Sequence, residues 1–423
     1  MISELYNTSI RAYQALLQLI APINPKARLW VEGRRSWAAV LSKKLAESHT
    51  SGPVAWFHAA SLGEFEQGRP VIEAFRTQYP DYRILLTFFS PSGYEVRKNY
   101  AGADYVVYLP ADTPANARRF VELVKPQLAF FIKYEFWYNY LRELKAAQVP
   151  VISFSAIFRP DQLFFKPYGG FYRNLLGYFD HILVQNSQSV DLLKRIGITS
   201  VTLAGDTRFD RVAQVAAARR KIPVAKAFKN SQPLLVVGSA WQADMDILIP
   251  FLNQFTKPLK VIIAPHDIHE DEIERWRSQF TKPSRRFSQT SETDVSSGEI
   301  LFIDNVGMLS SLYQYGEFAY IGGAFGKGLH NILEAATFGM PLFFGPRYGK
   351  FQEAIDLMSE GAAFPVNNTA ELTAAFARQY ADRSRAAQVS HDYVQRNIGA
   401  TAQVMKVVTN LLSGRANRNA GPE

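Results

Sequence analysis

Cysteine is absent from this chain of 423 residues, which excludes a disulfide framework and any metal site built on thiolates. The absence is compatible with a reducing compartment but does not require one. Histidine occurs only seven times, and no HxxxH pair or His/Asp cluster has convincing metal-ligand spacing. We therefore expect an activity that needs no metal ion and no other cofactor.

Long apolar runs are also missing. The apolar part of the N-terminus is interrupted by Asn7, Arg11 and Gln14, so it is a poor membrane-spanning helix. It also lacks the cleavage site of a signal peptide. Its apolar side chains could form one side of a helix in a membrane interface, with basic residues just beyond to meet acidic headgroups. The apolar residues are Leu5, Tyr6, Ile10, Tyr13, Leu16, Leu17, Leu19 and Ile20, and the basic residues are Lys26, Arg28, Arg34 and Arg35. The alternative is a helix packed on its own domain, and we favour membrane contact.

Acidic residues are fewer than basic ones: the chain has 38 acidic and 47 basic residues, which gives a net charge of +9. This balance favours anionic partners, meaning phosphorylated substrates, an acidic membrane surface or nucleic acid. Nucleic acid is the weakest of the three because the basic residues are scattered and no binding motif is present. We predict no nucleic-acid partner.

Short apolar runs alternate with helical segments along the chain, which is typical of parallel sheets wound with helices on both faces. The runs of the first half are 54–58, 84–89, 105–109, 128–132, 151–154, 181–184 and 201–204. Those of the second half are 234–238, 261–264, 300–303, 318–322 and 342–344. The join falls near residues 211–232, and 282–298 is predicted to be a surface loop. The pattern predicts an α/β protein with two doubly wound domains, whose ligands bind at the carboxyl ends of strands.

A glycine-rich segment between two of these strands carries the clearest ligand-binding pattern. Its loop contains Gly322, Gly323, Gly326 and Gly328, which let backbone amides approach a ligand. Residues 331–337 then have helical composition, with Asn331 and Glu334 on one face. An anion at the helix start and sugar hydroxyls at Glu334 would suit a nucleotide. The spacing matches neither the Walker loop nor the dinucleotide fingerprint, so ATP hydrolysis and hydride transfer are disfavoured.

In the first half, Glu64 follows the run 54–58 at the predicted start of a helix. A carboxylate there can accept a proton from a substrate hydroxyl, although the helix dipole lowers its pKa. The alternative is that Glu64 only caps the helix. Glu66 is a competitor that lies further into the helix.

Two further loops follow strands at matching places, residues 133–137 and 205–210. Arg208, in the second loop, could neutralise a phosphate leaving group, or it could be an ordinary surface arginine.

Several short motifs recur in a specific order through nearly the whole chain. They include HAASLGEFEQGRPVI, YEFWYN, AGDTRFD, GSAWQAD, IIAPHDIHEDEIER and GGAFGKGLHNILEAATFGMP. In these motifs the chain resembles the Kdo transferases of lipopolysaccharide synthesis, which move 3-deoxy-D-manno-oct-2-ulosonic acid (Kdo) from CMP-Kdo to a lipid A precursor. The resemblance implies the glycosyltransferase-B fold, two Rossmann-like domains that face each other across a cleft. We place a membrane-associated helix and its basic flank at 1–35, an acceptor domain with the catalytic base at 36–220, and a donor domain with a closing C-terminal helix at 221–423.

The resemblance also implies roles for single residues. Glu64 would take the proton from the attacking hydroxyl of the acceptor, and CMP would leave in one inverting displacement. Arg208 stands where the family usually has a lysine that stabilises charge, and Glu135 belongs to the same catalytic group. The donor-binding residues would be Pro265, His266, Val306, Gly307, Met308, Gly323, His330, Asn331, Ile332, Leu333 and Glu334. The implied location is the cytoplasmic side of the inner membrane.

Three departures from the family pattern concern charge. Lys133 replaces a glutamate often credited with transition-state stabilisation, the usual Pro-Arg-His is Pro265-His266-Asp267, and Met308 replaces a common glutamate. We expect Lys133 itself to contact the Kdo carboxylate.

Three rival functions are open at this point. They are a UDP-sugar transferase similar to lipid A disaccharide synthase, an isomerase similar to UDP-N-acetylglucosamine epimerase, and a membrane-associated scaffold with a decayed site. Protection by CMP but not by UDP against thermal unfolding would favour the Kdo transferase.

Overall fold

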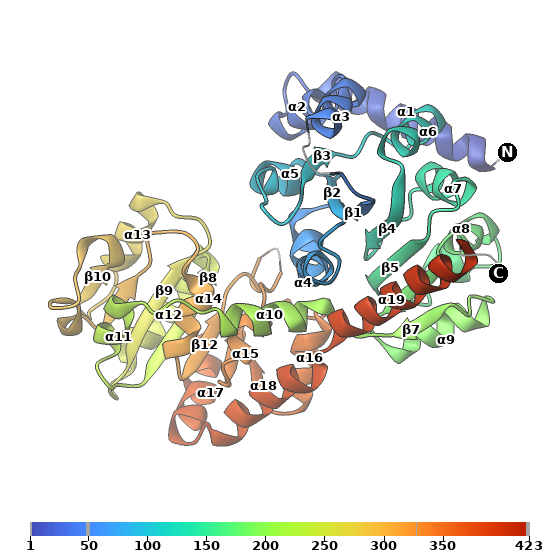
Figure 1. Ribbon diagram of the computed structural model, residues 1–423. Coiled ribbons are helices and arrows are strands. Elements are labelled where there is room, and N and C mark those ends of the chain that lie inside the picture. The colour runs from blue at the N-terminus through green and yellow to red at the C-terminus, as the bar shows by residue number, and fades with distance from the viewer. Residues whose placement is uncertain (1, 48–50, 327, 420–423) are drawn as a thin grey trace. The chain divides into compact units, whose positions relative to one another are not determined.

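The computed structural model describes residues 2–47, 51–326 and 328–419. The chain divides into two compact units (Figure 1). Unit 1 comprises Met1–Arg211 and Gly399–Glu423, and unit 2 comprises Val212–Ile398. Among the described residues, no helix is both long and apolar enough to cross a membrane.

The described residues of unit 1 form a parallel sheet of seven strands. They are β1 (Val54–Ala59), β2 (Arg83–Phe88), β3 (Tyr105–Tyr108), β4 (Pro126–Ile132), β5 (Val151–Ala156), β6 (His181–Val184) and β7 (Val201–Leu203), in the spatial order β3-β2-β1-β4-β5-β6-β7. The strands predicted for the first half of the sequence are all confirmed, with ends that differ by at most two residues.

The helices of unit 1 cover both faces of this sheet. They are α1 (Ile2–Ile20), α2 (Pro25–Glu32), α3 (Trp37–Ala46), α4 (Leu62–Gln78), α5 (Pro91–Arg97), α6 (Pro114–Val124), α7 (Tyr138–Ala146), the 3-10 turn η1 (Leu163–Phe165), α8 (Gly170–Leu176), α9 (Ser187–Arg195) and α19 (Ala400–Asn419). Helix α10 (Thr207–Ala217) runs through the point where unit 1 ends.

The core of unit 1 has two layers because alternate residues of a strand point to opposite faces. Trp56 and Phe131 belong to one buried cluster, and their neighbours Phe57 and Phe130 belong to the other. Phe57 and Phe130 stack with their ring centroids 4.2 Å apart. Burial on both faces explains why these strands read as continuous apolar runs in the sequence.

The described residues of unit 2 also form a parallel sheet of seven strands. They are β8 (Leu234–Ala240), β9 (Lys260–Pro265), β10 (Ser284–Arg286), β11 (Ile300–Phe302), β12 (Phe318–Ile321), β13 (Leu342–Phe344) and β14 (Ala363–Pro365), in the order β10-β11-β9-β8-β12-β13-β14. The five predicted strands are confirmed. The sequence missed β10 and β14, which are three-residue strands at the two sheet edges. The prediction of a surface loop over 282–298 was therefore wrong at β10, whose polar residues give no apolar run.

The helical segments of unit 2 are mostly short. They are α11 (Pro223–Lys229), α12 (Gln242–Gln254), α13 (Glu270–Arg277), η2 (Phe287–Gln289), η3 (Val295–Ser297), α14 (Leu309–Leu312), η4 (Tyr313–Tyr315), α15 (Leu333–Ala336), α16 (Gln352–Ser359), α17 (Thr369–Ala381) and α18 (Ser384–Asn397).

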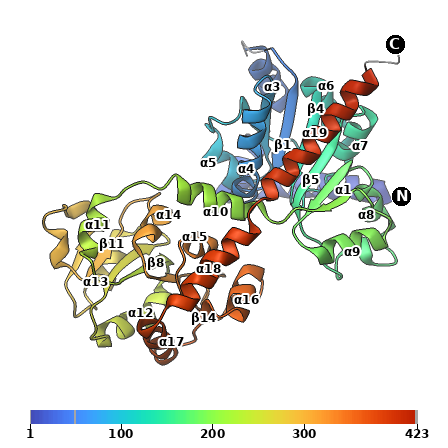
Figure 2. The same ribbon diagram turned by 60° about the horizontal axis from the view of Figure 1, so that its bottom comes forward.

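The C-terminal helix α19 packs on unit 1, beside α4 (Figure 2). Val404, Met405 and Val408 are buried in the same cluster as Phe57. The Asp210 carboxylate accepts hydrogen bonds from the backbone N–H groups of Gly399 and Thr401, at 2.7 Å each, and so fixes the chain where it re-enters unit 1. The sequence-based division placed 221–423 in one domain and therefore differs at this helix. An amphipathic pattern shows that a helix is buried on one side, but not which sheet covers it.

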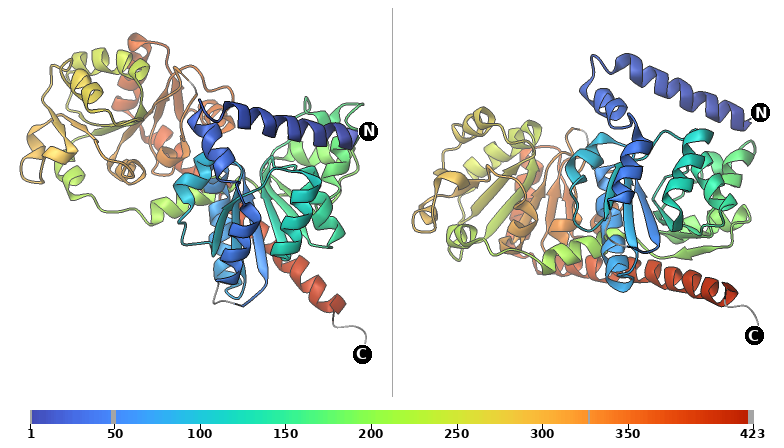
Figure 3. Two further views of the ribbon diagram at one scale, coloured as in Figure 1. Left: turned by 90° about the horizontal axis from the view of Figure 1, so that it is seen from above. Right: turned by 45° about the horizontal axis from the view of Figure 1, so that its top comes forward.

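Helix α1 lies on the opposite side of unit 1 from α19 (Figure 3). The Tyr6 hydroxyl donates a hydrogen bond to Asp112 at 2.6 Å, and Asn7 is buried. Leu16 and Leu19, in contrast, are 54% and 77% exposed. The apolar residues expected on one side are thus divided between a face packed on unit 1 and an exposed face.

Candidate functional site

The strand order of unit 1 reverses between β1 and β4. In open parallel sheets, ligands bind at the carboxyl ends of strands beside such a switch point. Glu64 follows β1, and residues 133–137 follow β4. The structure therefore brings together the loops that carry Glu64, Lys133 and Glu135.

Glu64 is the third residue of α4 and forms a capping box at its start. Its Oε2 accepts hydrogen bonds from the backbone N–H groups of Ala60 at 2.7 Å and Ser61 at 3.2 Å. Both hydrogen bonds that the structure describes for this carboxylate fall on Oε2, which leaves Oε1 for a substrate. The capping alternative is thus observed, and it is compatible with a role in proton transfer.

Burial raises the pKa of Glu64 to about 7, and the negative charge of Glu135 acts in the same direction. The Ala60 N–H group and the Lys133 ammonium act in the opposite direction. The sequence argument expected the helix dipole to lower this pKa, and burial outweighs that effect. A carboxylate with a pKa near neutrality suits a general base better than an ordinary glutamate.

A buried hydrogen-bond network holds Glu135. His58 Nδ1 lies 2.8 Å from Thr87 Oγ1, and His58 Nε2 lies 3.1 Å from Glu135 Oε2. Trp137 Nε1 donates to the same carboxylate oxygen at 2.5 Å, and Trp56 Nε1 donates to Thr87 Oγ1 at 2.8 Å. A proton on His58 Nε2 gives every one of these atoms a partner. Sequence reasoning missed His58 as a site residue, although a polar residue ending an apolar strand was the available signal.

Lys133 is the first residue after β4 and has a left-handed backbone with φ of 68°. This region is uncommon for residues other than glycine and is often found at functional sites. The Lys133 N–H group donates to the Phe154 carbonyl at 2.9 Å, and Lys133 Nζ lies 5.1 Å from the centre of the Tyr134 ring. The backbone is thus fixed by the neighbouring strand while the ammonium acts on Glu64.

Arg208 lies at the start of α10, in the loop that follows β7. Arg208 Nε donates to Asp206 Oδ2 at 2.8 Å, and Gln67 Nε2 donates to Asp206 Oδ1 at 2.7 Å. Gln67 lies one helical turn after Glu64 on α4. The structure therefore ties the Arg208 loop to the helix of Glu64, although β5 and β6 separate β7 from β4.

Glu66, the competing carboxylate, is held by two arginines. Arg97 Nη2 donates to its Oε1 at 2.6 Å, and Arg211 Nε donates to its Oε2 at 3.2 Å. Both of its oxygens are engaged, so Glu66 is a poor proton acceptor.

Three aromatic rings stack at the carboxyl ends of the central strands of unit 2. The centroids of Trp241 and His266 are 4.2 Å apart, and those of His266 and His330 are 4.5 Å apart. Trp241 Nε1 donates to His330 Nε2 at 3.0 Å. Burial lowers the pKa of His330, and the neighbouring His266 lowers it further. Both effects favour the neutral ring. Trp241 was not among the predicted site residues.

Asp244 holds the glycine-rich loop through hydrogen bonds. Its Oδ2 accepts hydrogen bonds from the Trp241 N–H group at 3.0 Å and the Gly323 N–H group at 2.9 Å, and its Oδ1 accepts from Tyr320 at 3.1 Å. Gly323 has φ of 93°, and a Cβ there would lie 2.6 Å from the Gly328 carbonyl oxygen. Only glycine fits this turn.

The helix expected over 331–337 is shorter in the structure, because α15 covers Leu333–Ala336. The Asn331 amide donates to Glu334 Oε1 at 3.0 Å, and Asn331 Oδ1 accepts from the Leu333 N–H group at 3.2 Å. Ile332 and Leu333 are fully buried. Neither residue therefore presents exposed surface to a donor in this structure.

The remaining predicted donor contacts lie on two neighbouring loops. Pro265 ends β9 and is half-buried, and His266 is exposed. Val306 is 87% exposed, Gly307 has φ of 84°, and Met308 precedes α14. Within the described residues, no group of three His, Cys, Asp or Glu side chains could hold a metal ion.

Comparison with known proteins gives the fold first. The UDP-GlcNAc 2-epimerase of Neisseria meningitidis bound to UDP-GlcNAc is 13% identical, with a TM-score of 0.61, over 86% of this chain and 100% of that chain. At this identity the likeness shows only the fold. Two doubly wound parallel domains of this kind define the glycosyltransferase-B fold, and the fold prediction is confirmed.

The sequence comparisons narrow the class. Residues 34–211 match the family described as 3-Deoxy-D-manno-octulosonic-acid transferase (kdotransferase). The 3-deoxy-D-manno-octulosonic acid transferase of Aquifex aeolicus (strain VF5) is 29% identical over 324 residues, which cover 75% of this chain and 83% of that protein. The enzyme of the same name from Haemophilus influenzae (strain ATCC 51907 / DSM 11121 / KW20 / Rd) is 23% identical over 373 residues, which cover 84% of this chain and 86% of its own. The resemblance to the Kdo transferases is confirmed.

Proposed function

We propose that this protein transfers Kdo from CMP-Kdo to a phosphorylated, acylated glucosamine disaccharide of the lipid A precursor type. The observation that carries the proposal is Glu64, a half-buried carboxylate with one oxygen left for substrate and a pKa raised to about 7. It lies within the segment that matches the Kdo transferases.

In the proposed reaction, Glu64 Oε1 accepts the proton of the attacking acceptor hydroxyl. A bond forms between that oxygen and the anomeric carbon of Kdo, and the bond from that carbon to the phosphate oxygen of CMP breaks. Because the nucleophile and leaving group lie on opposite sides, the configuration inverts. Lys133 and Arg208 are the cations of unit 1 that would balance the charges of the Kdo carboxylate and the departing phosphate.

The donor would bind to unit 2. The stacked Trp241, His266 and His330 rings present an aromatic surface, and Glu334 can accept hydrogen bonds from ribose hydroxyls. Gly323 allows close approach of the backbone to a phosphate.

The acceptor chemistry also suggests where the protein works. The exposed leucines of α1 are suited to the interface of a membrane, which would present an acylated acceptor. We place the protein on the cytoplasmic side of the inner membrane.

The decisive experiment incubates purified protein with CMP-Kdo and a tetra-acylated lipid A precursor and weighs the product. A mass increase of one or two Kdo residues, lost in Glu64→Gln, is the expected result. No product with the wild-type protein would overturn the proposal.

The fold is shared with UDP-GlcNAc 2-epimerases, so the nucleotide must be tested separately. CMP is expected to raise the unfolding temperature more than UDP does. Protection by UDP alone would favour the UDP-sugar alternatives, and protection by neither nucleotide would favour the scaffold.

A further inference from the structure

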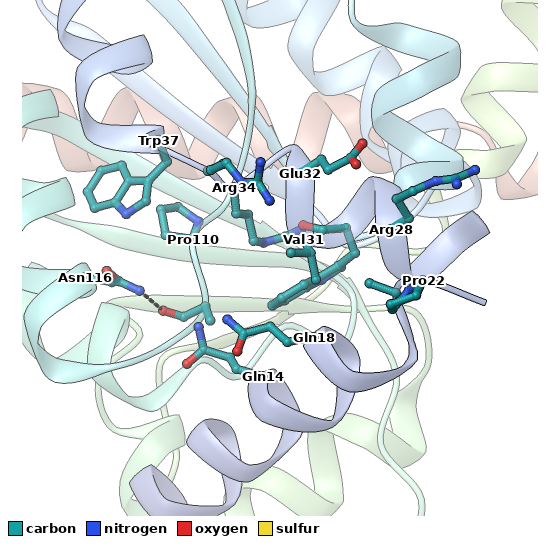
Figure 4. Close-up of a pocket in the computed structure, with 14 residues that line it drawn as sticks. Gln14, Gln18, Pro22, Arg28, Val31, Glu32, Arg34, Trp37, Pro110 and Asn116 are labelled. Carbon is teal, nitrogen blue, oxygen red and sulfur yellow. Dashed lines mark hydrogen bonds between the residues drawn. The ribbon is translucent and has the colours of Figure 1, made fainter. Parts of the chain in front are cut away.

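A groove of about 660 Å³ lies in unit 1 between α1, α2 and the loop that follows β3 (Figure 4). Gln14 and Gln18 line it from α1, and Arg28 lines it from α2. On the side of β3, the Asn116 amide donates to the Ala111 carbonyl at 3.0 Å. The groove thus combines amide groups with positive charge.

Arg34 is the buried cation of this groove. Its guanidinium donates to the backbone carbonyls of Leu109 at 2.8 Å, Trp30 at 3.1 Å and Phe89 at 2.6 Å. Among the described residues, no carboxylate lies within ion-pair distance of it. Burial lowers the pKa of Arg34 to about 9, so the charge is held without an anion at a cost.

A second polar group, in the groove wall, has no hydrogen-bond partner among the described residues. Trp30 is 6% exposed, and its Nε1 has no hydrogen-bond partner in the part of the chain that the structure describes. Buried indole N–H groups usually find an acceptor. Arg28 and Arg35 are exposed at the rim, where Glu32 is the acidic residue among the lining residues. Three arginines and one glutamate leave the groove positive.

The groove lies on the same sheet edge as Glu64. Pro110 and Ala111 line it from the loop after β3, and Arg34 donates to the Phe89 carbonyl in the loop after β2. In the order β3-β2-β1, these two strands are the second and first neighbours of β1, which precedes Glu64, and neighbouring strands lie about 5 Å apart. The Phe89 ring lies 5.8 Å from the groove residue Trp30 and 4.8 Å from Trp137, which donates a hydrogen bond to Glu135. An acceptor could therefore reach Glu64 while another part of it lies in the groove.

Apolar side chains lie beside this positive groove. Leu19 and Ile23 are 77% and 85% exposed, next to the groove residues Gln18 and Pro22. A ligand that satisfies both features carries an anionic group and apolar chains.

We propose that the groove binds the phosphate group of an acylated sugar acceptor, with Arg34 at its base and Arg28 and Arg35 at its rim. The identity of the acceptor rests on the proposed function, whereas the chemistry of the ligand rests on the groove itself. Binding here would direct the acceptor hydroxyl toward Glu64.

The test uses the double variant Arg28→Gln/Arg35→Gln, because both side chains are exposed and their loss should not impair folding. The KM for a phosphorylated tetra-acyl disaccharide should rise about tenfold, with kcat at saturation retained, since the lost contacts act on binding. The KM for the dephosphorylated disaccharide should not change. Arg11→Gln is the matched control, because Arg11 is an exposed arginine of α1 that does not line the groove.

Measuring affinity for lipid vesicles distinguishes binding of the acceptor in the groove from general attraction of the arginines to an anionic membrane. If the double variant and Arg11→Gln lose equal affinity for phosphatidylglycerol vesicles and equal activity, the arginines act as membrane contacts only and the groove proposal fails. Direct binding of the phosphorylated disaccharide to Glu64→Gln, which cannot turn over, separates the two proposals. Binding that needs Arg28 and Arg35 would support the groove even if the wild-type protein shows no transfer.

Discussion

The two units place an acidic residue at the same structural position and use it differently. Glu64 in unit 1 and Asp244 in unit 2 are each the third residue of the helix after the first strand of their unit. Each accepts a hydrogen bond from the backbone at the start of its own helix. Asp244 also accepts from the Gly323 N–H group and the Tyr320 hydroxyl, so both of its oxygens are occupied.

The difference lies in burial and in the number of engaged oxygens. Asp244 is completely buried, while Glu64 is half-buried with its described hydrogen bonds on one oxygen. Burial raises the pKa of both groups. The doubly wound fold thus provides a capping carboxylate at each switch point, and the surroundings decide whether one or both of its oxygens accept hydrogen bonds from the protein.

The largest expected effect is on turnover in Glu64→Gln. The amide oxygen can still accept from Ala60 and Ser61, but it cannot take a proton. We expect kcat to fall by about 10²- to 10⁴-fold with little change in donor binding. Steady-state kinetics and CMP titration measure the two quantities, and retained turnover would exclude Glu64 as the base.

The same variant should also change how stability depends on pH. Because the folded pKa of Glu64 is raised from 4.5 to about 7, the protonated form favours the folded state. This contribution is complete below about pH 4.5 and is lost as the pH rises through about 7. A glutamine at position 64 does not titrate, so Glu64→Gln does not lose this contribution. The free energy of unfolding of the variant in urea, relative to wild type, should therefore increase as the pH rises from about 4.5 to about 7. A constant difference would mean that Glu64 is not titrating there.

For Asp244→Ala the expected effect is on stability. Two backbone N–H groups and the Tyr320 hydroxyl would lose a buried acceptor, at a cost of about 2–4 kcal/mol in the free energy of unfolding. Denaturant unfolding measures it. A variant that kept full stability would remove the contrast between the two carboxylates.

The next effect is a shift in the pH dependence of kcat/KM. Substitutions of two neighbours of Glu64 should move it in opposite directions. The acid limb of kcat/KM should have its midpoint near pH 7. Glu135→Gln removes a negative charge and should move it to lower pH, whereas Lys133→Met removes a positive charge and should move it to higher pH. Glu66→Gln is the control and should leave the midpoint in place. Shifts in the same direction for both variants would contradict this account.

The sequence predicted the sheets well because buried parallel strands give apolar runs. It missed the edge strands β10 and β14, because each has only three residues and those of β10 are polar, so neither gives an apolar run. It also predicted that Glu64, Lys133 and Arg208 follow strands of the first sheet, as the structure has them. It could not predict that burial outweighs the helix dipole at Glu64, or that Gln67 ties Asp206 to α4, because both depend on packing between segments distant in sequence. Asp244 was missed for the same reason, whereas His58 carried a signal in the sequence, as a polar residue at the end of an apolar run.

The smallest expected effect is in unit 2, where Trp241→Phe tests the aromatic stack. Phenylalanine retains a ring against His266 but removes the hydrogen bond from Trp241 Nε1 to His330. If the stack binds the donor, the KM for CMP-Kdo should rise about three- to tenfold, which corresponds to one lost hydrogen bond. The kcat should stay near its wild-type value, because this unit supplies no proton acceptor in the proposed reaction. A fall in kcat with unchanged KM would instead assign Trp241 to the chemical step, and the division of roles between the two units would then be wrong.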